Sequence, residues 1–164
     1  MTDMAREILF EAASQIEDAV SLLHSCYSEV TGLFNDYEAA DSFVTRQTLA
    51  AQICTSLMIS IQLEEDIFQP AAKRVLKEKG IISAVKMKQA ILKYLVKEIE
   101  ELDTDSAVYD IKIRVLHEHV KAHFQENERT LFPQAQKACG KFNLWGLGAQ
   151  LVQRNQLRPK MCMC

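Results

Sequence analysis

The chain has little glycine and little proline. Its 164 residues include five glycines and three prolines, and the prolines are Pro70, Pro133 and Pro159. Because these two residues are the strongest local interrupters of regular structure, their scarcity argues against a fold of many short strands joined by tight turns. Long uninterrupted stretches lie between the glycines, and they favour helices.

The chain also lacks a large excess of one charge and a long apolar run. Its formal net charge is −3, with 19 basic residues interspersed among 22 acidic ones, so we expect no partner among nucleic acids or membranes. No stretch approaches the roughly 18 uncharged apolar residues of a membrane span. Asp3, Glu7 and Glu11 interrupt the first segment, unlike a secretory signal. Five cysteines do not make a disulfide scaffold, and we expect a cytoplasmic protein.

Apolar residues recur every three or four positions in four segments, as in helices that each bury one face. The predicted helices span residues 4–37, 42–79, 82–102 and 107–137, and Pro70 and Pro133 should kink or break the second and fourth. Because short loops join neighbouring helices in opposite directions, the sequence predicts an all-α, up-down-up-down antiparallel four-helix bundle. A short extra C-terminal helix is predicted near residues 143–156. We expect residues 1–158 to form one domain and residues 159–164 to form a flexible tail.

Polar residues interrupt each predicted apolar seam near its middle. Antiparallel packing would bring these residues to a similar height, in one transverse layer of the bundle. Carboxylate and histidine side chains in bundle cores commonly bind metals, so the layer is either a metal centre, a rebuilt one or the remains of one. The interrupting residues are Tyr27 on the first helix, Ser60 and Glu64 on the second, Gln89 on the third, and His123 and Asn127 on the fourth.

The second and fourth predicted helices share a local pattern. Glu64 and Glu128 each stand four residues before a phenylalanine that is followed closely by proline. With residues 18–23 and 52–54, these two runs resemble the hemerythrin-like, or HHE cation-binding, domains, and the similarity covers roughly residues 16–138. The resemblance implies a four-helix bundle with two irons in its core. The usual ligands are a histidine on the first helix, H-x-x-x-E on the second, one or two histidines on the third, and a histidine on the fourth that is followed by a carboxylate.

Most of these ligand positions are substituted in this chain. The resemblance implies that Glu64, His123 and Glu128 keep ligand identities. Because imidazoles supply much of the affinity of an iron pair, we expect no full diiron centre. The resemblance then implies a degenerate centre in a regulatory or interaction module that does not carry oxygen. The substituted positions hold Tyr27 for the first histidine, Ser60 for the histidine of H-x-x-x-E, Gln89 and Lys93 for the third-helix histidines, and Asn127 four residues after His123.

Two interpretations of the layer remain open. In one, Glu64 is held by a buried hydrogen-bond network, because an unpaired buried charge is too costly. In the other, one iron or another divalent metal is bound by Glu64, His123, Glu128 and Tyr27, or by a displaced set that includes His24, with redox, peroxide or oxygen-sensing chemistry. No nucleophile triad or phosphate-binding loop indicates an enzyme. The partner is an unknown protein or small ligand, and a homodimer is compatible with the sequence.

Overall fold

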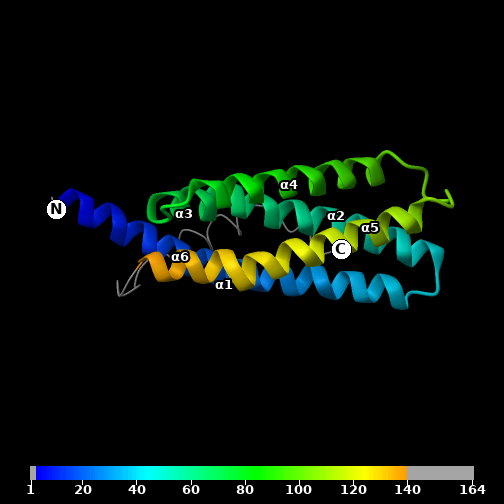
Figure 1. The fold of residues 1–164 in the computed structure, drawn as a ribbon. Helices are drawn as coiled ribbons and strands as arrows, with labels where there is room; N and C mark the ends of the chain where they lie inside the picture. Colours follow the sequence, from blue (N-terminus) through cyan, green and yellow to red (C-terminus); the bar gives the residue numbers. More distant parts are fainter. Residues whose placement is uncertain (1–2, 140–164) are drawn as a thin grey trace.

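The computed structural model describes residues 3–139, and in this part of the chain every regular element is a helix, which confirms the all-α prediction. The helices form four long rods, and Figure 1 shows them side by side along a common axis. The predicted C-terminal helix and tail lie outside the described residues. The first rod is α1 (Asp3–Ala39); the second is α2 (Phe43–Leu63), η1 (Glu64–Phe68) and α3 (Gln69–Val75); the third is α4 (Lys79–Glu100); the fourth is α5 (Tyr109–Glu126), η2 (Asn127–Leu131) and α6 (Phe132–Cys139).

The ends of the second rod show one prediction that is confirmed and one that is wrong. The predicted start near residue 42 is confirmed, because the side chain of Ser42 caps α2 by accepting a hydrogen bond from the backbone N–H of Thr45. The rod does not continue to Gly80, however. It ends at Val75, where Leu76 takes an extended conformation and packs against the core, and α4 begins at Lys79. Gly80 therefore lies inside α4 and does not end the second rod.

Each proline inside a rod follows a π turn. In η1 the N–H of Gln69 bonds to the carbonyl of Glu64, and in η2 the N–H of Phe132 bonds to the carbonyl of Asn127, each five residues back. Pro70 and Pro133 come directly afterwards. A proline inside an α-helix lacks an N–H and its ring clashes with the carbonyl four residues earlier. The wider π turn marks where the backbone adapts, and such turns are frequent at functional sites.

The core lies along the common axis. Its largest fully buried side chains include Phe34, Phe68, Leu57 and Leu116, and burial of each contributes roughly 1.5–3 kcal/mol. The first rod packs closely on the second and on α6, and α4 packs closely on α5, whereas α1 and α5 approach each other at fewer points. None of the helices within residues 3–139 has the length and apolar character needed to cross a membrane.

Candidate functional site

The polar residues predicted to form one layer do lie together, and all four rods contribute to it. Tyr27 comes from α1, Glu64 from the start of η1, Gln89 from α4 and His123 from α5. Each of these four residues is at most 2% exposed. The network therefore sits inside the core, where each polar atom must find a partner within the protein.

Glu64 is the centre of the layer. Tyr27 Oη donates to Glu64 Oε1 at 2.5 Å, and Gln89 Nε2 donates to Glu64 Oε2 at 2.5 Å. His123 Nε2 lies 3.2 Å from Oε1 and 3.0 Å from Oε2. Because a carboxylate oxygen accepts hydrogen bonds, His123 donates to Glu64 in the tautomer that carries its proton on Nε2. Donors from three other rods thus converge on one carboxylate, and both of its oxygens are engaged.

Tyr27 serves as a neutral donor. Burial, followed by the charge of Glu64 and the hydrogen bond to it, raises the pKa of Tyr27 well above its ordinary value. Its ring stacks on Phe124, with centroids 3.7 Å apart and planes at 11°. Its Oη also accepts a hydrogen bond from Asn127 Nδ2 at 2.7 Å. A phenolate here would face the Glu64 carboxylate, so the arrangement favours the phenol.

Gln69 also belongs to the network, although its position in the sequence does not fall on the predicted apolar seam. Its Nε2 donates to Gln89 Oε1 at 2.7 Å, and the residue is 1% exposed. The π turn places the residue five positions after Glu64 on the inner face, whereas an α-helix would place positions three and four there. Ser60 is buried in the same rod, but its hydroxyl donates to the carbonyl of Leu57 at 2.9 Å.

Glu128 does not join the layer. Its carboxylate pairs with His24 Nδ1 at 2.9 Å on the surface, where the two side chains are 38% and 50% exposed. The residue that corresponds to Glu64 by its place in the π turn is Asn127, because both begin the turn and both stand six residues before proline. An alignment of the two runs on their π turns therefore differs by one residue from an alignment on Phe68 and Phe132. That offset turns Glu128 outward.

Lys93, at the position of a second histidine in the resemblance, lies at the edge of the bundle. Its Nζ donates to both oxygens of Glu65, at 2.6 and 2.7 Å. Its side chain is 38% exposed and that of Glu65 is 32% exposed. The lysine charge is therefore paired outside the layer and does not enter the network around Glu64.

The donor set of the layer does not fit a diiron centre. It offers one carboxylate and one imidazole, and an iron pair in a helical bundle is bound by several of each. In the described part of the chain, three buried side-chain atoms have no hydrogen-bond partner: Gln69 Oε1, His123 Nδ1 and Asn127 Oδ1. Within residues 3–139, no group of three or more histidine, cysteine, aspartate and glutamate side chains is placed to hold a metal ion.

Cys26 directly precedes Tyr27 in α1, whereas Cys54 lies in α2 ten residues before Glu64, which is about 15 Å along the helix. Cys54 is buried, and burial raises the pKa of its thiol to about 12. Cys26 is partly buried. Because the thiolate is the reactive form of cysteine, Cys54 is an unreactive core residue at neutral pH. Cys162 and Cys164 lie outside the described residues.

Comparisons of the chain with protein-family models, with curated proteins and with solved structures find no match.

Proposed function

We propose that this chain is a degenerate hemerythrin-like domain, in which a hydrogen-bond network among protein side chains takes the place of the diiron centre. The observation that carries the proposal is the saturation of Glu64. Tyr27, Gln89 and His123 engage both oxygens of its buried carboxylate. In the layer that would hold metal in a hemerythrin-like domain, the protein's own side chains satisfy the central carboxylate.

The fold and the connections support the family part of the proposal. We infer an up-down-up-down antiparallel four-helix bundle, because connections as short as residues 40–42 and 76–78 typically join neighbouring helices that run in opposite directions. The π turns η1 and η2 are each followed by proline. This shared pattern supports an internal repeat, in which the two halves of the bundle are similar helical hairpins.

A network of this kind suits a module that binds partners and does not perform redox chemistry. Hydrogen bonds to a charged group contribute roughly 1.5–3 kcal/mol each, and here they join all four rods through one carboxylate. The bundle can therefore hold one arrangement of its helices without a metal. We propose a cytoplasmic regulatory or interaction module that carries no oxygen, whose outer faces are free to bind a protein partner or a small ligand.

Metal analysis and the visible spectrum of the purified protein test this proposal. We expect a colourless protein with well below two irons per chain. Stoichiometric iron with an oxo-bridge absorption band would overturn it. The rival is one iron or another divalent metal held through Glu64, His123, Glu128 and Tyr27. It would be favoured if chelators lower the melting temperature of the parent but not of Glu64→Gln.

A further inference from the structure

The start of α1 extends beyond the other rods, as Figure 1 shows. Three large apolar side chains are exposed there: Met4 is 70% exposed, Ile8 is 48% exposed and Phe10 is 41% exposed. A helix end that packs on nothing gains little stability in water, because most helical stability in proteins comes from packing of an apolar face. Clustered exposed apolar residues of this kind mark a contact site.

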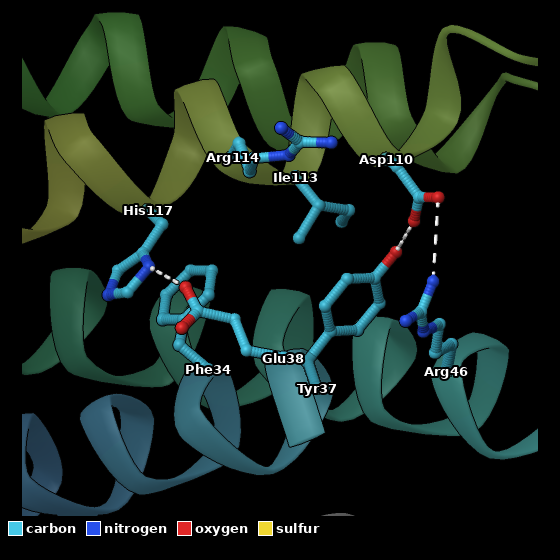
Figure 2. A pocket seen from close by; sticks show the side chains of 8 residues that line it. All are labelled: Phe34, Tyr37, Glu38, Arg46, Asp110, Ile113, Arg114 and His117. Carbon is cyan, nitrogen blue, oxygen red and sulfur yellow. Dashed lines mark hydrogen bonds and ion pairs between the residues drawn. The ribbon is translucent and has the colours of Figure 1, made fainter. Parts of the chain in front are cut away.

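The other end of α1 is held by neighbouring helices. Figure 2 shows that Tyr37 donates a hydrogen bond to Asp110 of α5, and that Glu38 pairs with His117 Nδ1 at 3.2 Å. By contrast, none of the described side chains of residues 3–11 is joined to another rod by a hydrogen bond or an ion pair. The start of α1 therefore lacks a partner among the described rods.

The described chain ends beside this part of α1. Two contacts between α1 and the fourth rod set their register: His24 with Glu128 at 2.9 Å and Glu17 with Gln136 at 2.9 Å. The contacts thus move toward the start of α1 as the fourth rod proceeds. Continued at the same pace, they bring Cys139, where α6 ends, to the level of Ser14. Burial and then the charge of Glu17 raise the pKa of the Cys139 thiol, which agrees with this position.

Ser14 is covered on the outer face of α1. It is 2% exposed, whereas Ser21 and Ser28, which lie about two and four turns further along on the same face, are exposed. Ala12 and Ala13 are also buried, and consecutive helical residues point in directions about 100° apart. At this level α1 is therefore covered on its outer side as well as on the side of the core.

The sequence after Cys139 has the length and the apolar residues to cover the start of α1. A helix over residues 143–156, which the sequence predicts, would be about 21 Å long, and α1 extends roughly 16 Å beyond Ser14 at 1.5 Å per residue. The large apolar residues in the first half of this segment are Phe142, Leu144, Trp145, Leu147, Leu151 and Val152.

Charge permits this contact but does not select it. Residues 140–164 contain four basic residues and no acidic residue. Glu7 and Glu11 are exposed and form no ion pair within the part of the chain that the structure describes. However, Lys73 and Arg74 are exposed on α3, which also packs on α1, so this end of the bundle has no large excess of negative charge. Apolar contact and the path of the chain select the segment.

We propose that residues 140–164 dock on the start of α1 in the same chain. The segment leaves α6, crosses the outer face of α1 at Ser14 and covers Met4, Ile8 and Phe10. This contact accounts for the burial of Ser14 on a face that is otherwise exposed. A segment tethered at Cys139 is present at a high effective concentration, which favours it over a second copy of the chain. The inference goes beyond the proposed function, because it assigns a contact within the chain and not an external partner.

A second apolar stripe, on α4, is less accessible to this segment. Its exposed residues are Met87, Ile91 and Tyr94. The ion pair of Lys88 and Glu126 sets the stripe about 20 Å back along the fourth rod from Cys139, whereas the start of α1 lies directly ahead of α6. Residues 79–97 of α4 also contain lysines and no acidic residue, which makes the stripe less favourable for a basic segment.

The test uses Trp145, the only tryptophan of the chain, as an intrinsic reporter in the chain 1–164. Acrylamide should quench Trp145 at least about threefold less efficiently than it quenches N-acetyltryptophanamide, because a packed indole is shielded from solvent. Ser14→Lys should raise the quenching constant at least about twofold, because a lysine at the crossing point cannot be buried without a partner. The matched control is Ser21→Lys, on the same exposed face, which should leave the constant unchanged.

Two double variants separate the start of α1 from the stripe on α4. Ile8→Gln combined with Phe10→Gln should raise the quenching constant of Trp145, whereas Met87→Gln combined with Ile91→Gln should not. All four side chains are exposed, so these variants keep the core intact even if Ser14→Lys fails to fold. Amide hydrogen exchange of residues 3–11 should become faster in the α1 variants, while the amides of α2 and α5 keep their protection.

Four outcomes would overturn the docking of the segment. These are a Trp145 as accessible as the free compound, equal effects of Ser14→Lys and Ser21→Lys, an effect of the α4 double variant as large as that of the α1 double variant, and loss of protection on dilution together with a dimeric mass in sedimentation. The last outcome would assign the segment to a second copy. None of these readouts depends on metal content, so a failure here is distinguishable from failure of the metal-free network.

Discussion

Replacing Glu64 by leucine should destabilise the protein far more than replacing it by glutamine. Leucine strands three buried donors, on Tyr27, Gln89 and His123. Each stranded donor costs roughly 1–3 kcal/mol, and removal of a buried charge offsets part of that loss. We expect the free energy of unfolding to fall by more than about 3 kcal/mol, a large share of the roughly 5–15 kcal/mol that is typical of a domain.

Glutamine at position 64 should cost less than about 2 kcal/mol, because the neighbouring amides can reverse. Its carbonyl oxygen would accept from Tyr27 and His123. Its amide N–H would donate to Gln89 if the Gln89 side chain turned over, and Gln89 would then donate to Gln69 Oε1 if the Gln69 side chain turned over too. Every donor that faces Glu64 thus keeps an acceptor.

Urea unfolding followed by circular dichroism at neutral pH measures both changes. Ser60→Ala is the matched control in the same rod, because the Ser60 hydroxyl donates to the carbonyl of Leu57 and its removal strands no donor on another rod. In the Glu64→Leu background, Tyr27→Phe should recover about 1 kcal/mol or more by removing one stranded hydroxyl. If Glu64→Leu is no less stable than Glu64→Gln, the argument from converging donors is refuted.

Three further predictions concern alkaline stability, iron binding and the start of α2. Burial and the Glu64 charge raise the pKa of Tyr27 above 10.0, so the unfolded chain loses the phenol proton at a lower pH than the folded protein does. The free energy of unfolding should therefore fall as pH rises above about 10, and it should fall less steeply in Tyr27→Phe. Urea titrations from about pH 9 to 11 measure both slopes. Tyr27→His, Ser60→His and Gln89→His together should take up iron under anaerobic loading, and uptake no greater than that of the parent would contradict the placement of the lost ligands. Ser42→Ala should lower the free energy of unfolding by about 1 kcal/mol, and thermal melts that match the parent would show that the cap contributes nothing.

Helical periodicity predicts most of the fold and the polar layer. The apolar spacing located the four rods, and the polar interruptions at Tyr27, Glu64, Gln89 and His123 identified the residues that meet in the core. Such a pattern is readable because an amphipathic helix has one buried face, so each polar residue on that face must find a partner in the core. The all-helical character follows from the same pattern.

The periodicity is not informative beyond the π turns. An α-helical count from Glu64 places Ile67 on the seam, but Ile67 is partly exposed while Phe68 and Gln69 are buried. Pro70 signals a disturbance, but a kink and a π turn are both ways to accommodate a proline. For the same reason the sequence pairs Glu64 with Glu128, although the turn geometry makes Asn127 its counterpart. Surface pairs such as that of Glu128 depend on side-chain geometry that no periodicity encodes.

The π turns also imply that the length of each rod is part of the design of the core. Asp66 is an exposed residue inside η1. Deletion of Asp66 would leave enough chain for a continuous α-helix. Gln69 would then stand four residues after Glu64 and stay on the inner face of the helix. Pro70 would return to the clash that the turn relieves, which costs about 3 kcal/mol or more. An in-frame deletion of a surface residue should therefore damage the protein as severely as a substitution in its core.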